Sequence, residues 1–216
     1  MAKSFAVLGM GRFGSSVALA LYDSGEDVMI VDRDEELLEQ LSPKVTYAVA
    51  AELTDEDTIK SLGLENMDAV IVAMGMDLEA SIMCVMVAKE LNVPIIMAKA
   101  RNKRMGEILT RIGATRIIYP EEETGIRIAK LLVAKDFIDF FDLSDKLCLI
   151  ELRPKPEWLG KSLRQLDLKN EYNINIVAIK HGSDGEFDHM IDPDMLFDKD
   201  DVLLMIIDKK NLKRIS

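Results

Sequence analysis

The sequence predicts an α/β protein in which a doubly wound parallel sheet is followed by a second, smaller α+β domain. Three observations support this prediction. From residue 1 to about 120, short apolar runs alternate with helical patterns, which is typical of a parallel sheet with helices on both faces. A glycine-rich turn directly follows the first apolar run, and from residue 143 the pattern changes to strand-like runs separated by turn residues.

The glycine-rich turn has the spacing of a nucleotide-binding motif. Residues 5–8 form an apolar strand, and Gly9, Gly11 and Gly14 then give the pattern G-x-G-x-x-G. In such turns the first glycine permits the tight bend, the second admits a phosphate, and the third lets the next helix pack closely, with its positive end toward the anion. Asp32 ends the second apolar run, where an acidic partner for the ribose hydroxyls is expected. This segment therefore predicts a Rossmann-type nucleotide site.

Further apolar runs predict the rest of the parallel sheet, and their near-continuous Val and Ile content indicates strands buried on both faces. Six strands are expected in all, at residues 5–8, 28–31, 47–50, 69–73, 95–98 and 116–119. Beyond the helix that follows the glycine turn, helices are expected at 34–41, 55–62, 78–91 and 103–112. Thr54 and Asp77 stand where helix N-caps are expected.

The next segment is unusually apolar. A helix is predicted from Pro120 through Val133, and three phenylalanines within residues 137–141 are expected on a further helix or on the end of this one. Packing against the sheet is one interpretation. Because that sheet already has helices on both faces, we favour burial of the surplus apolar surface against a second subunit.

Residues 143–216 predict the smaller domain, an α+β module of roughly 70 residues that is small but viable if it dimerises. The expected organisation is a nucleotide-binding domain at 1–120, crossover helices at 121–142 and the second domain at 143–216. Strands are expected at 147–152, 174–180 and 202–208, a short helix at 163–168, a tight loop at 181–185 and a turn at 192–194.

Composition excludes some classes of function. The 38 acidic and 27 basic residues give a formal net charge of −11, which opposes binding to DNA or another polyanion. Cys84 and Cys148 lie in apolar runs, so buried thiols in a reducing cytoplasm are expected. We find neither a signal peptide nor an apolar run of about 18 residues that would span a bilayer.

The sequence lacks complete motifs for several other kinds of chemistry. Ser162 follows a Gly-Lys pair, but Lys155 stands where a Walker A loop needs its first glycine, so a helix N-cap at Ser162 is the better interpretation. His181 and His189 lack zinc-ligand spacing, and the acids around them lack calcium-loop spacing. No nucleophile, base or proton donor stands near the glycine turn. This favours a sensor, and leaves an NAD-dependent oxidoreductase with a small second domain as the alternative.

Residues 9–14, 31–32, 70–75, 99–102, 112–121 and 159–163 carry a further pattern. Through them the chain resembles, over nearly its whole length, the RCK (regulator of potassium conductance) family, in particular the cytoplasmic nucleotide-binding subunits of Trk/Ktr-type potassium uptake systems. The resemblance implies binding of ATP, ADP or NAD(H) in the first domain, a regulatory second domain, dimerisation through crossing helices, and an octameric ring beneath a membrane-embedded subunit that conducts potassium.

The resemblance also implies roles for individual residues. Asp32 would bind the ribose and Arg12 would reach the phosphates. Lys99 would assist in binding the nucleotide. Glu121 would approach the nucleotide of the neighbouring subunit, where Mg²⁺ or Ca²⁺ can bridge carboxylate and phosphate; alternatively, it is an ordinary first-turn acid stabilised by the helix dipole. The other residues expected at the nucleotide site are Phe13, Arg33, Ala51, Glu52, Leu53, Ala73, Met74 and Gly75.

Two positions depart from the family pattern. Glu52 stands where relatives usually carry an Asp or Asn near the base, so the resemblance does not settle how the adenine edge is recognised. Some relatives bind cyclic di-AMP in an apolar cleft at the dimer interface of the smaller domain, which makes this dinucleotide a further expected ligand. Arg164 stands where those relatives tend to carry an apolar residue.

Overall fold

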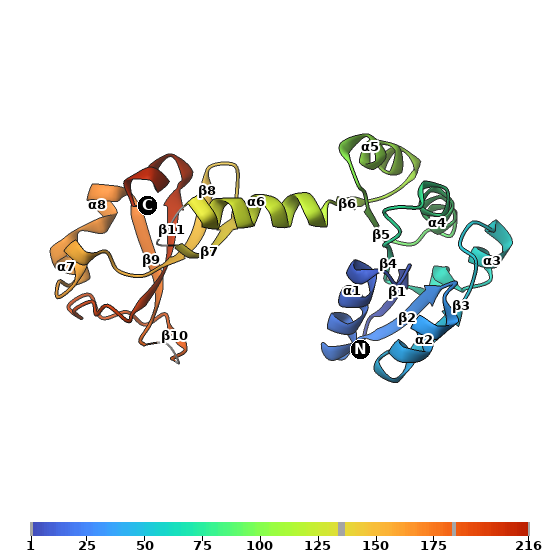
Figure 1. The fold of residues 1–216 in the computed structure, drawn as a ribbon, viewed down its shortest axis with the longest axis horizontal. Helices are drawn as coiled ribbons and strands as arrows, with labels where there is room; N and C mark the ends of the chain where they lie inside the picture. The colour runs from blue at the N-terminus through green and yellow to red at the C-terminus, as the bar shows by residue number, and fades with distance from the viewer. Residues whose placement is uncertain (1, 134–136, 183–184, 216) are drawn as a thin grey trace. The chain divides into compact units, whose positions relative to one another are not determined.

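The computed structural model describes residues 2–133, 137–182 and 185–215. The chain divides into two compact units, residues 1–122 and 123–216, each with its own sheet (Figure 1). Among the described residues, no helix has both the length and the apolar character needed to cross a bilayer.

The first unit contains a six-stranded sheet in the order β3-β2-β1-β4-β5-β6 with every pairing parallel, which confirms the predicted doubly wound fold. The direction in which the chain adds strands reverses beside β1, and in open parallel sheets ligands bind at such a point, outside the carboxyl ends of the strands. The strands are β1 (Ser4–Leu8), β2 (Asp27–Asp32), β3 (Tyr47–Ala50), β4 (Ala69–Val72), β5 (Ile95–Lys99) and β6 (Arg116–Ile118).

Helices connect these strands. They are α1 (Arg12–Asp23), α2 (Glu35–Leu41), α3 (Glu56–Lys60), α4 (Leu78–Glu90) and α5 (Lys103–Ile112), with short 3-10 turns at Ser42–Lys44 and Leu64–Asn66.

The N-caps of α3 and α4 test two predictions. Asp77 caps α4 as expected, because its Oδ1 accepts a hydrogen bond from the Ala80 backbone N–H at 3.0 Å. Thr54 was the wrong residue for α3. The cap is Asp55, whose carboxylate accepts from the Thr58 N–H at 2.8 Å, so α3 begins at Glu56.

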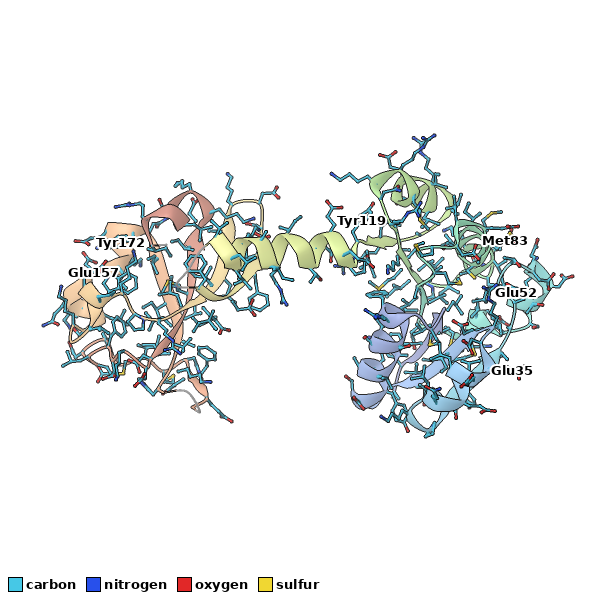
Figure 2. The ribbon with its side chains drawn as sticks, in the orientation of Figure 1. Glu35, Glu52, Met83, Tyr119, Glu157 and Tyr172 are labelled. Atoms are coloured by element: carbon cyan, nitrogen blue, oxygen red, sulfur yellow. The ribbon has the colours of Figure 1, made fainter. Side chains whose placement is uncertain are left out.

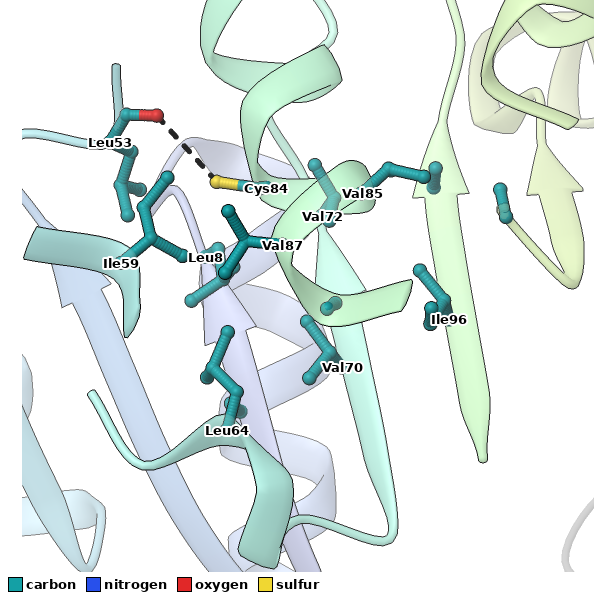
Figure 3. Close-up of a cluster of buried hydrophobic side chains, with 14 of the residues drawn as sticks. Leu8, Leu53, Ile59, Leu64, Val70, Val72, Cys84, Val85, Val87 and Ile96 are labelled. Carbon is teal, nitrogen blue, oxygen red and sulfur yellow. Dashed lines mark hydrogen bonds between the residues drawn. The ribbon is translucent and has the colours of Figure 1, made fainter. Parts of the chain in front are cut away.

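Two apolar clusters cover the two faces of this sheet. One packs under α1 and α2 and includes Val7 and Ile30; the other packs under α3, α4 and α5. Cys84 lies at the centre of the second cluster, and its Sγ lies 3.7 Å from the Leu53 carbonyl oxygen (Figure 3). Burial raises the pKa of Cys84 to about 12, so this residue is the buried thiol that the sequence predicts.

After β6 the chain forms α6 (Pro120–Val133) and then β7 (Phe137–Asp142), an edge strand of the second sheet. The helix is as predicted, and none of its described residues is buried. The prediction of a helix for the phenylalanine-rich segment is wrong, because it forms a strand antiparallel to β8. A register shift between Phe137 and Asp139 places Phe137 and Phe140 in the same core. This spacing of three residues imitates the period of a helix.

The second unit contains an antiparallel sheet in the order β10-β9-β11-β8-β7. The three predicted strands are confirmed as β8 (Leu147–Leu152), β9 (Ile174–Lys180) and β11 (Val202–Asp208), and β10 (Phe187–Asp188) is added. The predicted helix at 163–168 is instead α7 (Leu163–Leu166) and α8 (Leu168–Tyr172), because Asp167 adopts a left-handed backbone conformation with φ of 44°. Residues 183 and 184 of the predicted tight loop lie outside the described residues.

Candidate nucleotide site

The glycine turn joins β1 to α1 at the carboxyl edge of the sheet. Gly9 has φ of 94° and donates its N–H to the Val31 carbonyl at 2.8 Å, which requires a residue that tolerates the left-handed region. A Cβ on Gly14 would lie 2.0 Å from the Gly9 carbonyl oxygen, so only glycine allows α1 this close to the strand. A Cβ on Gly11 would meet nothing within 4 Å, and this face of the turn is open to a ligand.

The N-terminus of α1 faces that open space without a competing anion. Gly11 is the N-cap, no side chain caps the helix, and the first turn holds no acidic residue. By contrast, Asp34, Asp55 and Asp77 cap α2, α3 and α4. An uncapped helix N-terminus leaves backbone N–H groups and the positive end of the dipole available for a phosphate.

Asp32 ties the end of β2 to the glycine turn. Its Oδ2 accepts a hydrogen bond from the Met10 N–H at 2.6 Å, and its Oδ1 accepts from the Asp34 N–H at 3.0 Å. The carboxylate is half-buried and borders the cavity beside the turn. Each oxygen keeps a lone pair for a further donor, so Asp32 can hold the turn and still accept from a ribose hydroxyl.

A cavity of about 210 Å³ adjoins Asp32 at the same edge of the sheet. Six of the predicted residues line it: Asp32, Arg33, Ala51, Glu52, Leu53 and Met74. Sequence reasoning missed two more, Asp77 and Ala80, because it treated Asp77 only as a helix cap. The position of Asp77, just beyond β4, was the available signal. Glu52 lies on the segment that leads to α3 (Figure 2).

Lys99 extends from the end of β5 toward α1. Its aliphatic stem occupies the space beside Gly75, where a Cβ would lie 3.1 Å from the lysine Cε. The ammonium lies 5.8 Å from the centroid of the Phe13 ring and 2.7 Å from the Glu121 Oε1. The hydrogen bond from Lys99 lowers the pKa of Glu121. The structure thus gathers Phe13, Gly75, Lys99 and Glu121 beside the glycine turn.

The two remaining predicted residues differ in exposure. Arg12, the first residue of α1, is exposed, and none of the described carboxylates forms an ion pair with it. Ala73 is buried, and its Cβ lies 3.1 Å from where a Cβ of Gly14 would stand. Ala73 therefore packs against the glycine turn, whereas Arg12 is free to reach a ligand.

No group of three or more His, Cys, Asp or Glu side chains within the described ranges could hold a metal ion by itself. Glu121 contributes one carboxylate, so a cation there would need further oxygen ligands from the nucleotide or from another chain.

In the second unit, Ser162 is the N-cap of α7 and forms a capping box with Gln165, as the sequence predicts. Arg164 pairs with Asp194 at 2.7 Å. Its guanidinium is therefore engaged at the surface.

Two family models match the chain. The TrkA-N domain matches residues 5–120, which contain the glycine turn, Asp32 and Lys99, and the TrkA-C domain matches residues 148–216. The chain belongs to the TrkA-N/TrkA-C family.

Relatives of this TrkA-N/TrkA-C protein align over most of their lengths. It is 41% identical over 184 residues to the Ktr system potassium uptake protein C of Bacillus subtilis, covering 85% of this chain and 83% of that protein. It is 37% identical over 214 residues to protein A of the same system and organism, covering 99% and 96%. Among solved structures, the GsuK channel bound to NAD shares the fold, with a TM-score of 0.66 and 13% identity. This chain spans 39% of that one's length.

Proposed function

We propose that this protein is a nucleotide-sensing regulatory subunit of a Ktr-type potassium uptake system. The observation that carries the proposal is its likeness, at 37–41% identity and across both domains, to proteins named as Ktr system potassium uptake proteins. The open glycine turn, the uncapped N-terminus of α1 and Asp32 support nucleotide binding in the first unit.

The proposed ligands are ATP and ADP, with NAD(H) as the second possibility. Asp32 would accept from the ribose, Arg12 would reach the terminal phosphate, and the base would enter the cavity near Leu53. A 2′-phosphate would meet the negative charge of Asp32, so NADP(H) is expected to bind poorly. The GsuK channel, which shares the fold, has been solved with NAD bound, and this supports NAD(H) as the second possibility.

Glu121 is proposed to bind a divalent cation together with the nucleotide phosphates of a neighbouring subunit. Its side chain is 71% exposed, and the pair with Lys99 lies at the protein surface. A carboxylate there can add one hard oxygen ligand to those that phosphates supply to Mg²⁺ or Ca²⁺.

The proposed partners are a second copy of this chain and a membrane-embedded potassium-conducting subunit. The exposed apolar residues of α6 support the first, because they would be covered on dimerisation; they are Ile126, Ile128, Leu132 and Val133. The names of the relatives support the second. The homodimer is proposed to build an octameric ring at the cytoplasmic face of the membrane.

The protein is proposed to act by changing shape, with no catalytic step of its own. A ligand shifts such an equilibrium only by binding one ring conformation more tightly than the other. An oxidoreductase remains the formal alternative, but the relatives are uptake proteins. Cyclic di-AMP remains a predicted ligand of the second unit.

Calorimetric titration of the purified protein with ATP, ADP, NADH, NADPH and cyclic di-AMP tests the ligand assignment. We expect saturable binding of ATP and ADP or of NADH, and weaker binding of ATP in Arg12→Ala. Binding of NADPH as tight as that of NADH would contradict the role of Asp32. An absence of binding by ATP, ADP and NADH alike would refute the nucleotide-sensing proposal.

A further inference from the structure

The Lys99 ammonium lies where two parts of the first unit meet. On one side is the Phe13 ring, in the first turn of α1, whose uncapped N-terminus borders the open glycine turn. On the other side is Glu121, in the first turn of α6. Lys99 therefore stands between the proposed phosphate position and the start of the helix that contains the boundary between the two units.

The environment of Lys99 restricts where its charge can go. Its side chain is only 17% exposed, and its stem packs against Gly75. Among the described residues, Glu121 is the only carboxylate that pairs with it. A phosphate bound at the N-terminus of α1 would be a second anion within the same small space, and it carries more charge than a carboxylate.

We propose that Lys99 is a shared counter-ion, paired with Glu121 when the glycine turn holds no phosphate and turned toward the phosphate when a nucleotide binds. This inference rests on the proposed function, because it requires a nucleotide phosphate at the turn. The Lys99 ammonium has three N–H donors, but its stem is held against Gly75 and its side chain is only 17% exposed, so turning toward the phosphate draws it away from Glu121. Phosphate binding thus releases Glu121.

The release couples two binding events. A Glu121 carboxylate without its lysine partner is a better ligand for a divalent cation, so the nucleotide raises cation affinity at this position. By linkage, the cation must raise nucleotide affinity by the same factor. In the absence of divalent cations the pair opposes nucleotide binding, because it has to be broken first.

A double-mutant cycle measured by calorimetry tests the exchange. ADP is titrated into the full chain in EDTA, so that no cation can bridge. Glu121→Gln removes the competing carboxylate and should tighten ADP binding by roughly two- to fivefold, the range expected from an exposed ion pair. In a Lys99→Met background the same substitution should change ADP affinity by no more than the loss of one negative charge elsewhere in the unit does. Lys99→Gln serves as a second background if Lys99→Met fails to fold.

The matched control is Glu90→Gln. Glu90 also pairs with a lysine, Lys60, at 3.6 Å, but it lies at the C-terminal end of α4. This control removes the same charge from the same unit, so it reports the general effect of lower negative charge on binding an anion.

The outcomes separate this inference from the proposed function. The shared counter-ion is supported if wild type binds ADP and if Glu121→Gln tightens ADP binding more than Glu90→Gln does only when Lys99 is present. If Glu121→Gln changes ADP affinity by the same amount as Glu90→Gln, or by the same amount with and without Lys99, the inference is wrong and the proposed function stands. If wild type binds neither ADP nor ATP, the proposed function fails and the inference with it.

Discussion

The Lys99 ammonium lies 2.7 Å from the Glu121 carboxylate and joins the carboxyl end of β5 to the first turn of α6. The two residues are 22 positions apart. Their contact brings the edge of the sheet where nucleotides bind in this fold next to a helix none of whose described residues is fully buried. The pair therefore links the candidate site directly to α6.

The pair predicts a pH dependence of stability. The hydrogen bond from Lys99 lowers the pKa of Glu121 in the folded state. A lowered pKa contributes stability that is fully present above the unfolded value of about 4.3 and is lost as pH falls through the folded value. The difference in urea midpoint between wild type and Glu121→Gln should be largest near pH 7 and should vanish in acid. Glu122→Gln is the control, since Glu122 has no ion pair within the described residues; an equal profile for both variants would contradict the pairing.

Divalent cations should distinguish the two interpretations of Glu121. With ATP and at fixed ionic strength, Mg²⁺ or Ca²⁺ should raise the melting temperature of wild type and have little added effect in Glu121→Gln. The helix-dipole contribution of an exposed first-turn acid is below about 1 kcal/mol and does not depend on which cation is present. An identical cation response in the two proteins would leave Glu121 as an ordinary first-turn carboxylate.

Asp32 should affect both binding and stability. Asp32→Ala removes the acceptor for the ribose and also the acceptor for the Met10 N–H in the glycine turn. Leaving a part-buried donor unsatisfied costs about 1–3 kcal/mol, so we expect weaker binding of every ribonucleotide and a lower unfolding midpoint without ligand. Calorimetry and urea titration measure the two effects. Wild-type affinity for ATP and NADH in this variant would rule out Asp32 as the ribose ligand.

Arg12 should report on the terminal phosphate. A charge-assisted hydrogen bond contributes about 1.5–3 kcal/mol, so Arg12→Ala should weaken ATP binding by roughly tenfold or more and affect ADP and AMP less. Arg104→Ala, at an exposed position in α5, controls for the loss of one positive charge. Equal losses for ATP, ADP and AMP would place Arg12 away from the terminal phosphate.

The parts of the fold that depend on local sequence were predictable. Gly9, Gly14 and Asp32 are constrained by turn geometry and spacing, and the structure brings them together as the motif requires. Continuous Val and Ile runs identified the parallel strands because such strands are buried on both faces.

The remaining features depend on tertiary contacts. Phe137 and Phe140 share a core only because of a register shift in β7, so their spacing indicated a helix. Asp77 lines the cavity because the segment from β4 to α4 lies at the same sheet edge as Asp32, and its position just beyond β4 was the one local signal of this. The contact between Lys99 and Glu121 requires β5 and α6 to meet at the sheet edge, and no periodicity in the sequence encodes it.

The central claim is that this chain regulates potassium flux in response to a nucleotide. The most direct measurement is potassium flux into liposomes that contain a Ktr-type membrane subunit, with and without the purified chain, in ATP and in ADP. The account predicts that adding the chain makes flux differ several-fold between the two nucleotides, and that Arg12→Ala reduces this difference. Two results would contradict a gating role, provided that both nucleotides bind the chain. One is a flux that does not change when the chain is added, and the other is a flux that is equal in ATP and in ADP.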